Sequence, residues 1–458
     1  MSHSPLQDHK TDPGFLAPWE KAFDRVLSPF EEFIHRQTTT GLILMLSAVV
    51  AVFVANSSLA NAYHHLTHTP LGLQAGSWSL SMSLHHFVND GLMALFFFVV
   101  GLELKREMLV GELARPRQAA LPIVAALGGM VAPAMIYLAF NPAGTAAAGW
   151  GIPMATDIAF AIGALVLLAS RVPRTLITFL VALAIVDDLG AVVVIALFYT
   201  DQIVMPALLA AGGLTLLLVV FNRAGIRMLT PYFLVALLLW YALLQSGVHA
   251  TLAGVIAAFT IPAYPQYDPE HFSTRIGSLL EAFGHSRQRD GNIMTNDEMR
   301  LIAQQVEHHA QKLGTPLQRL EQFWHLPVAF LVIPAFALVN AGIPFAFDTL
   351  SSTLSHPVTL GVMLGLVGGK CLGITGASWL ALKFGLGELP AGTRFSQIAA
   401  VSLMGGIGFT MAIFIAELGF ADAPELLLMA KTGILLASLF AGLAGFIALW
   451  WLGRHHDE

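Results

Sequence analysis

The sequence predicts an all-α membrane protein that crosses the bilayer about twelve times. Three observations support this fold class: the apolar composition, a series of long apolar segments, and an uneven distribution of basic residues between the loops. Of the 458 residues, 56% are hydrophobic and 11% are charged, and the mean hydropathy is +0.70. Soluble domains carry roughly 25% charged residues. The composition therefore argues against a soluble protein.

Twelve segments have the length and composition of membrane spans, each of which takes about 20 mostly apolar residues in a helix. They lie near residues 39–57, 88–108, 120–140, 150–170, 176–199, 204–222, 231–246, 249–263, 327–345, 358–382, 396–418 and 425–451. The seventh and eighth segments are short and meet near Ser246 and Gly247, so the count can change by one. A long polar lead precedes the first segment, so we expect a retained span and no cleavable signal peptide.

Basic residues fall on alternate loops, and this sets the orientation because lysine and arginine favour cytoplasmic loops. If the segment before the first span is inside, the loops on that side hold Lys105, Arg106, Arg115, Arg117, Arg171, Arg174, Arg223, Arg227, Lys383, Arg394 and Arg454. The loops on the other side (58–87, 141–149, 200–203, 246–248, 346–357 and 419–424) contain no lysine or arginine. We therefore expect both termini in the cytoplasm.

Polar segments divide the chain into four regions. These are an N-terminal cytoplasmic or interfacial segment (1–37), the first part of the transmembrane bundle (38–263), a cytoplasmic loop (264–322) and the second part of the bundle (323–458). Within the first region, residues 15–34 place apolar side chains at helical spacing between charged ones. This pattern indicates an amphipathic helix, either on the membrane surface or packed on the bundle.

Two further segments outside the spans have distinct patterns. Residues 71–84 alternate apolar and serine side chains after a turn near Gly76, which is typical of a small β-hairpin on the outside face. Its second strand carries Trp78, Leu80 and Met82. The segment 264–322 is polar and contains His271, His285, His308 and His309. A run of mixed charge of this kind is more typical of a flexible, solvated loop than of a metal site.

Three ionisable residues lie near the middle of predicted spans. Asp187 and Asp188 lie about twelve residues from either end of their span, and Lys370 is equally far from the ends of its own, which is roughly 18 Å of helix. A lysine side chain reaches about a third of that distance and cannot extend to the interface. Each charge costs about 2.5–3.5 kcal/mol at a helix centre. A structural ion pair would explain one aspartate and the lysine but leaves the second aspartate without a partner, so we expect a functional site.

The adjacent aspartates have different surroundings because neighbouring residues of a helix point about 100° apart. One of Asp187 and Asp188 can pair with Lys370, and the other then faces a water-filled cavity. Carboxylate oxygens suit hard cations, and two carboxylates close together in a low-dielectric site repel each other. Such a site holds either protons or a cation, and the two compete. That competition is the minimum an exchanger of cations for protons requires.

Two of the predicted spans contain signals for a broken helix. One begins with Pro153-Met-Ala-Thr-Asp-Ile, which includes Thr156 and Asp157, and another contains Gly405-Gly-Ile-Gly-Phe-Thr. Breaks of this kind expose helix-end dipoles at membrane depth and occur where transporters bind ions, although glycines also serve helix packing. Asp157 could offset exposed N-terminal helix ends, and Lys370 exposed C-terminal ends.

An inverted repeat is also suggested by the order of these features. The three spans within 120–199 contain Gly128-Gly-Met, and the three spans within 358–451 contain Gly368-Gly-Lys at a matching position. Each three-span unit has its interrupted helix in the middle. Repeats with opposite topology are common in secondary transporters.

Seven strings of residues, distributed from residue 38 to near the end of the chain, occur in the order of a known family. They are Asn89-Asp-Gly-Leu-Met-Ala, Gly101-Leu-Glu-Leu-Lys-Arg-Glu, Ala155-Thr-Asp-Ile-Ala-Phe-Ala, Ala182-Leu-Ala-Ile-Val-Asp-Asp-Leu-Gly-Ala, Ser246-Gly-Val-His-Ala-Thr-Leu-Ala-Gly, Gly369-Lys-Cys-Leu-Gly-Ile and Gly405-Gly-Ile-Gly-Phe-Thr-Met. In these strings the chain resembles the bacterial NhaA-type sodium/proton antiporters. The match is specific because it rests on all seven strings together.

The resemblance implies a transporter without enzymatic activity or cofactor, located in the bacterial inner membrane. It would exchange cytoplasmic Na⁺, or Li⁺ as a surrogate, for external H⁺ by alternating access, electrogenically and in a pH-dependent way, and so serve pH homeostasis and salt tolerance. Asp188 would bind the ion or the proton, with Asp187 beside it in a salt bridge to Lys370. Thr156 and Asp157 would lie where the two interrupted helices cross.

The resemblance also implies groups linked to pH response and a mode of assembly. The pH-response groups, several of them at the cytoplasmic mouth, would be Glu103, Arg106, Glu107, His249, Glu321 and His325. The outside hairpin would join two protomers into a homodimer. Two departures lie in the pH-response region: the segment 264–322 is longer than expected, and Gln318 and Gln322 stand where the family pattern has a lysine and a histidine. The pH profile is therefore the least transferable property.

Other classes of protein fit less well. An intramembrane aspartyl protease places its aspartates on different helices, one within a Gly-x-Gly-Asp string that this sequence lacks. A solute symporter needs a roomy substrate cavity and no lysine opposite the aspartates. A passive channel needs a through-pore, usually from a ring of subunits. The net charge of −6 gives no indication of nucleic-acid binding, and the single cysteine, Cys371, excludes an internal disulfide.

Overall fold

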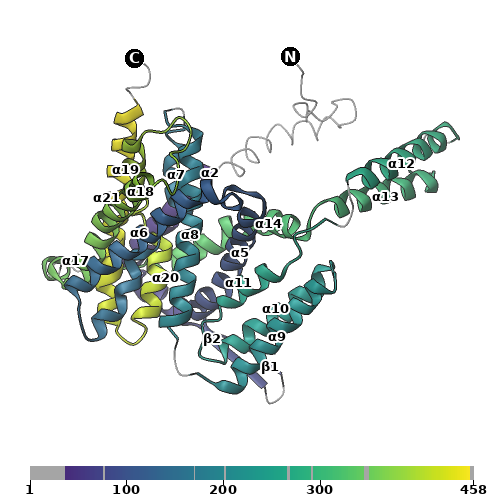
Figure 1. Ribbon diagram of the computed structural model, residues 1–458. Helices are drawn as coiled ribbons and strands as arrows, with labels where there is room; N and C mark the ends of the chain where they lie inside the picture. The colour runs from purple at the N-terminus through teal and green to yellow at the C-terminus, as the bar shows by residue number, and fades with distance from the viewer. Residues whose placement is uncertain are drawn as a thin grey trace.

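The computed structural model describes residues 37–75, 78–169, 171–200, 203–265, 269–289, 292–344 and 350–453. Over these ranges the chain forms a helical bundle with one small antiparallel sheet (Figure 1). The amphipathic helix predicted for residues 15–34 lies outside the described residues.

The helical elements follow one another along almost the whole described chain. In order they are α2 (Gln37–Ala55), α3 (Ala60–His68), α4 (Leu84–His86), η1 (Phe87–Leu92), α5 (Met93–Val110), η2 (Glu112–Ala114), α6 (Pro116–Phe140), η3 (Thr145–Met154), α7 (Ile158–Val166), α8 (Arg174–Phe198), α9 (Met205–Arg223), α10 (Leu229–Leu244), α11 (Leu252–Thr260), α12 (Pro269–Arg289), α13 (Asp297–Leu313), α14 (Pro316–Pro327), η4 (Val328–Val332), α15 (Ile333–Asn340), α16 (Leu350–Ser355), α17 (Pro357–Leu364), η6 (Gly365–Gly369), α18 (Lys370–Lys383), α19 (Phe395–Met404), α20 (Phe409–Gly419) and α21 (Pro424–Gly453). The elements η1, η4 and η6 are π-helical turns, and η2 and η3 are 3₁₀ helices.

Eight helical stretches of the described residues are long and apolar enough to cross a membrane. They are Leu84–Val110, Pro116–Phe140, Thr145–Val166, Arg174–Phe198, Met205–Arg223, Pro316–Asn340, Pro357–Lys383 and Pro424–Gly453. Two bent pairs pass the same test only when each is taken together, α2 with α3 and α19 with α20, which raises the count among the described residues to as many as ten. The chain is therefore a multi-pass membrane protein.

Each of the twelve predicted spans contains helix, but two are too short to qualify. The helix α10 has 16 residues and α11 has 9. The chain turns between the end of α10 and the start of α11 at Gly247, whose φ of 82° lies in the left-handed region that favours glycine. The start of the ninth span differs as well, because helix begins at Pro316 rather than near residue 327.

The predicted hairpin is confirmed. Strands β1 (Pro70–Ala75) and β2 (Trp78–Ser83) pair antiparallel, with Pro70 opposite Ser83 and Ala75 opposite Trp78. In Figure 1 the hairpin lies at the end of the molecule opposite to the one where α21 ends. We call the side with the strands the hairpin end.

The segment 264–322 is largely helical rather than a flexible loop. Helices α12 and α13 lie side by side and project away from the bundle (Figure 1). The turn between them is fixed by Asn296, whose side-chain oxygen accepts the backbone N–H of Met299 at 3.1 Å and caps α13. Ser286 donates to the same oxygen at 3.1 Å. The histidines that suggested a solvated loop lie on these helices, and caps of this kind are what the composition alone did not reveal.

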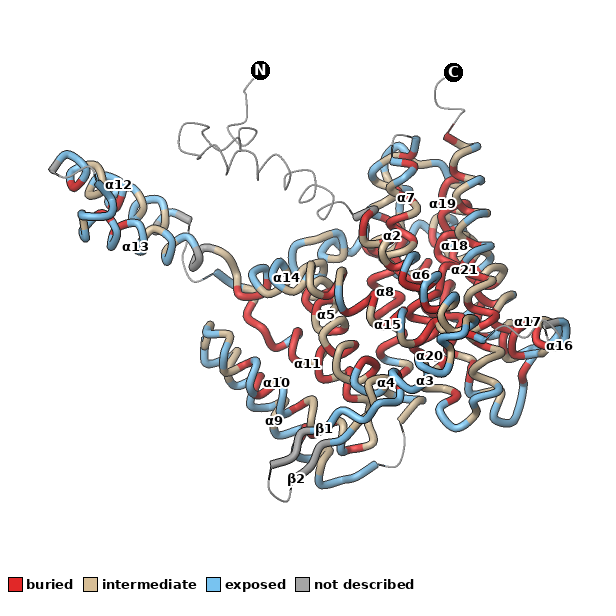
Figure 2. The backbone as a smooth tube through the Cα atoms, turned by 180° about the vertical axis from the view of Figure 1, so that it is seen from behind, coloured by how far each residue is buried: buried red, intermediate tan, exposed pale blue. Residues whose placement is uncertain are grey.

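Buried residues concentrate where α6, α8, α18 and α20 meet, whereas α9, α12 and α13 are largely exposed (Figure 2). Glycines let α6 and α18 approach closely at the centre. A Cβ atom on Gly373 of α18 would lie 2.2 Å from the carbonyl oxygen of Gly128 in α6, so any larger residue would push the helices apart. The π-helical turn η6 ends at Gly369 and leads directly into Lys370, which is fully buried.

Candidate functional site

Two breaks in the helical backbone meet within the bundle. One separates η3 from α7, and the other separates α19 from α20 with a bend of 50°. The backbone N–H of Asp157 donates to the carbonyl oxygen of Ile407 at 2.6 Å. This bond joins the two breaks beside Thr156 and Asp157.

Asp157 is held by the N-terminal ends of two helices. Its Oδ1 accepts the backbone N–H of Phe160 at 3.0 Å, which caps α7. Its Oδ2 accepts the backbone N–H of Thr410 at 3.1 Å and the hydroxyl of Thr410 at 2.5 Å, in the first turn of α20. Helix dipoles favour negative charge at these ends. Both oxygens of Asp157 are thus used in holding α7 and α20 together.

Asp187 and Lys370 form a fully buried ion pair between α8 and α18. The Oδ2 atom of Asp187 also lies 2.7 Å from Oγ1 of Thr156, which lies 2.8 Å from the carbonyl oxygen of Gly405. A threonine hydroxyl has one hydrogen. It can therefore donate to the carboxylate of Asp187 or to the carbonyl of Gly405, but not to both at once.

Three carboxylate oxygens at this centre have no hydrogen-bond partner within the described part of the chain. They are Oδ1 of Asp187 and both Oδ atoms of Asp188, and the two residues are 0% and 1% exposed. An ionised carboxylate buried without a partner is strongly unfavourable. Asp188 also lies within electrostatic range of Asp187, Asp157 and Glu103, with Lys370 as the basic group. The arrangement suits a proton or a hard cation at Asp188.

A second group of predicted residues lies together on α5 and α14. The guanidinium of Arg106 lies 3.1 Å from Oε1 of Glu107 and 3.1 Å from Oε1 of Glu321. Glu103 is within electrostatic range of all three side chains, and His325 is within range of Arg106. Five of the six residues that the resemblance linked to pH response are therefore neighbours.

The sixth, His249, has different surroundings. It lies in the turn between α10 and α11, within electrostatic range of Asp90 in η1. His85 and His86 are within range of the same carboxylate. His249 thus belongs with a histidine-containing group around α4 and η1 rather than with Arg106, a separation that the one-dimensional order of the motifs did not reveal.

Sequence reasoning missed several groups at and near the centre. It quoted the string that contains Thr410 but gave this residue no role, and the bond to Asp157 depends on a crossing that only the fold produces. It also overlooked Glu417, which pairs with Lys431 and His85. A signal for Glu417 was present, because it is a charged residue within the predicted span 396–418.

A multi-pass helical bundle with a buried aspartate pair and a buried lysine is typical of membrane transporters of ions. The chain belongs to the Na⁺/H⁺ antiporter 1 family, whose sequence profile matches residues 31–449. It is 57% identical over 435 residues to the Na⁺/H⁺ antiporter NhaA 1 of Saccharophagus degradans, covering 95% of this chain and 94% of that protein. It is 54% identical over 438 residues to the Na⁺/H⁺ antiporter NhaA of Sulfurimonas denitrificans, covering 96% and 98%. The resemblance stated from the motifs is confirmed.

Proposed function

We propose that this protein exchanges cytoplasmic Na⁺ for external H⁺ across the bacterial inner membrane, with the carboxylates of Asp187 and Asp188 as the exchange site. The observation that carries the proposal is the set of three buried carboxylate oxygens without a protein partner. Such oxygens are stable when protonated or beside a cation, so occupation by Na⁺ and by H⁺ exclude each other. The family and the printed names of the relatives support the same exchange.

Each residue of the centre has a distinct role in the proposed mechanism. Asp188 binds Na⁺ or a proton, and Asp187 provides a second oxygen while Lys370 offsets its charge. Thr156 redirects its hydroxyl toward the carbonyl of Gly405 when Asp187 no longer accepts it. Asp157 keeps the crossing intact. Li⁺ has the same charge and the same preference for oxygen, so it is carried as well.

The exchange is electrogenic in this proposal because two carboxylates can accept two protons in place of one monovalent cation. More positive charge then enters with protons than leaves with Na⁺. The mouth group of Glu103, Arg106, Glu107, Glu321 and His325 adjusts access to the site with pH. His249, which lies apart from this group, acts from another part of the protein.

We further propose a twelve-span topology with two discontinuous helices and an inverted repeat relating residues 120–199 to residues 358–451. In this topology both termini and the segment 264–322 are cytoplasmic, and the regions 1–37, 38–263 and 323–458 are the N-terminal segment and the two parts of the bundle. The absence of lysine and arginine from the loops of the hairpin end supports this orientation. The hairpin end is then the outside face.

Deleting residues 71–84 is expected to give monomers that still exchange ions. We propose that the hairpin joins two protomers, whereas every residue of the exchange site comes from one bundle. The measurement is molecular mass in detergent by light scattering, with exchange assayed on the same preparation. A deletion variant that remains dimeric would show that another surface holds the protomers together.

The onset of activity with pH is expected to move to lower pH when Na⁺ is raised. Protons and Na⁺ compete for the same carboxylates, so activity falls toward acidic pH through competition alone. The initial exchange rate is measured over pH 6–9 at several Na⁺ concentrations. An onset that stays at one pH at all Na⁺ concentrations would place control in a separate sensor, such as the group around Glu321 and His325.

Counterflow in proteoliposomes tests the proposal against a passive channel. Vesicles loaded with unlabelled Na⁺ and placed in trace labelled Na⁺ should accumulate the label transiently above equilibrium. The binding site of an exchanger crosses the membrane loaded in both directions, so each unlabelled Na⁺ that leaves can be replaced by a labelled one. A channel dissipates the gradient without such an overshoot once the membrane potential is clamped. Absence of the overshoot in vesicles that nevertheless take up Na⁺ would refute exchange.

A further inference from the structure

A second set of charged side chains, only partly buried, lies away from the aspartate centre. We call His85, Glu417 and Lys431 the hairpin-end triad. Oε1 of Glu417 lies 2.5 Å from Nζ of Lys431, and Oε2 lies 3.5 Å from Nε2 of His85. The side chains of Glu417 and Lys431 are 9% and 13% exposed, and that of His85 is 23% exposed. The two oxygens of the Glu417 carboxylate thus contact side chains from two different helices, α4 and α21.

The triad connects the exchange centre to the hairpin through one short helix. Glu417 lies near the C-terminal end of α20, and Thr410, which binds Asp157, lies in the first turn of the same helix. Seven residues separate them, which is two turns or roughly 10 Å of helix. His85 belongs to α4, which directly follows β2, and Lys431 belongs to α21. A shift of α20 relative to α4 therefore moves both the triad and the partner of Asp157.

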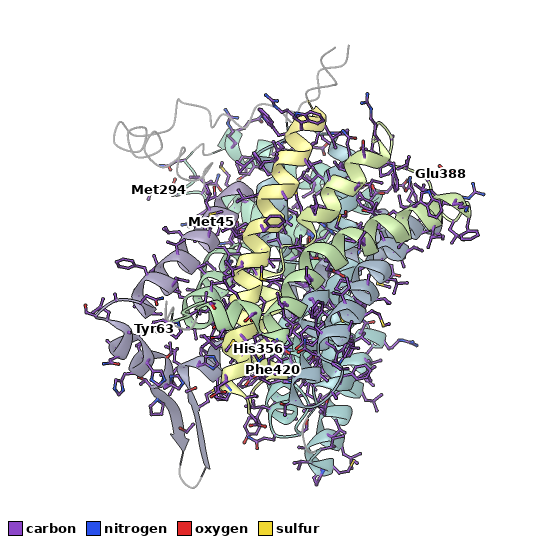
Figure 3. All side chains as sticks on the ribbon, turned by 90° about the vertical axis from the view of Figure 1, so that its left-hand side faces the viewer. Met45, Tyr63, Met294, His356, Glu388 and Phe420 are labelled. Carbon is purple, nitrogen blue, oxygen red and sulfur yellow. The ribbon has the colours of Figure 1, made fainter. Side chains whose placement is uncertain are left out.

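Figure 3 places Phe420, which directly follows α20, in the half of the molecule that ends in the strands, as it does Tyr63 of α3. Tyr63 lies within electrostatic range of Glu417, and its hydroxyl donates to the carbonyl oxygen of Leu338 at 2.8 Å. The end of α20 that carries Glu417 thus reaches the outside face in the proposed orientation. His85 is the member of the triad that water reaches most easily.

Other titratable groups surround His85 on the elements packed against it. The ring of His68 on α3 is stacked with that of His85 at a centroid distance of 6.2 Å, and the ring of His86 meets it edge-on at 5.9 Å. The remaining groups near the triad are His64, which is stacked on His68 at 4.1 Å, together with Asp90, His249 and Tyr63. Imidazole is the side chain whose charge ordinarily changes between pH 5 and 8. Within the triad, His85 is the imidazole.

We propose that His85 is a positioning residue that makes the position of α20 relative to α4 depend on the pH outside the cell. At acidic outside pH the imidazolium of His85 and the carboxylate of Glu417 form an ion pair that ties α20 to α4. At alkaline outside pH the neutral imidazole leaves Glu417 held mainly by Lys431. In this proposal the site opens toward the outside by a movement of α20 relative to α4, so outside acid slows this step. The inference rests on the proposed exchange function.

The test measures Na⁺/H⁺ exchange in proteoliposomes of known protein orientation, with inside pH and Na⁺ fixed and outside pH varied from 5.5 to 8.5. His65→Gln is the matched control, because His65 lies in the last turn of α3, as His68 does, and is exposed. It should give the wild-type profile, which includes simple proton competition. His85→Gln should be about two- to fivefold faster than the control at pH 5.5, the effect of one partly exposed ion pair, and equal to it at pH 8.5.

Two further variants distinguish a pH-dependent ion pair between His85 and Glu417 from a purely structural role of His85. His85→Lys carries a permanent charge and should remain slow at pH 8.5 as well as at pH 5.5. Glu417→Gln should give the profile of His85→Gln, and the double variant should not differ from either single variant. Profiles of His85→Gln and His85→Lys that both superimpose on the control overturn the proposal. If wild-type protein shows no exchange at all, the proposed function fails instead, so the two failures are distinguishable.

Discussion

Replacing Asp188 by asparagine is expected to reduce Na⁺-coupled proton movement in proteoliposomes to the level of protein-free vesicles. Asparagine keeps the shape of the side chain but has neither a titrating group nor a negative charge to hold Na⁺. Because both oxygens of Asp188 lack a protein partner in the described structure, no hydrogen bond is lost on substitution. The variant should insert and fold at least as well as the wild-type protein, since it removes an uncompensated buried charge.

The matched control is Asp422→Asn, the same change at an exposed position between α20 and α21. It should exchange at the wild-type rate. Melting in detergent gives a second measurement, because a bound ion stabilises the folded protein. Na⁺ should raise the melting temperature of the control but not that of Asp188→Asn. Substantial exchange by Asp188→Asn, or unchanged stabilisation by Na⁺, would contradict the assignment of the site.

Replacing Lys370 by glutamine is expected to lower stability while leaving the number of protons moved per Na⁺ unchanged in the transport that survives. The ammonium of Lys370 is fully buried and pairs with Asp187. Removing one member of such a pair costs about 3–5 kcal/mol because it leaves the other charge buried and uncompensated. The measurements are the reversal potential of exchange in proteoliposomes and the melting temperature in detergent.

Two comparisons sharpen the prediction for Lys370. The double variant Asp187→Asn/Lys370→Gln removes both charges and should regain much of the lost stability, whereas Lys383→Gln, at an exposed position of the same helix, should change little. If Lys370 instead carries one of the exchanged protons, Lys370→Gln moves fewer protons per Na⁺ and the exchange becomes less dependent on voltage. A changed reversal potential with an unchanged melting temperature would show that the structural role is wrong.

The sequence was sufficient for those features that depend on local pattern. Apolar length located most of the long apolar helices, alternation around Gly76 located the hairpin, and charges in apolar segments singled out Asp187, Asp188 and Lys370 as candidates. The geometry of a helix also required that only one of the two adjacent aspartates pair with the lysine. Which one does so depends on how α6, which packs against both α8 and α18, places those two helices, and the pattern left that choice open.

Features produced by tertiary contacts were not accessible in this way. The bond between Thr410 and Asp157 joins residues 253 positions apart and exists because two helix breaks cross. The π-helical turn before Lys370 lies in close contact with Pro133, and sequence periodicity encodes neither the turn nor the contact. Helices α12 and α13, in contrast, carry local signals that the polar composition of the segment obscured: both are amphipathic, and Asn296 caps α13. The separation of His249 from Arg106 is likewise a property of the fold.

The central claim is that Na⁺ and H⁺ exchange for one another through this protein, and the most direct test is a single vesicle experiment. Purified protein is reconstituted into proteoliposomes that carry an imposed pH gradient, acidic inside, and Na⁺ is then added outside. The account predicts that Na⁺ dissipates the gradient, that Li⁺ does the same, and that K⁺ at equal concentration does not. A gradient unaffected by Na⁺ at every pH between 6 and 9, in vesicles shown to contain folded protein, would contradict it.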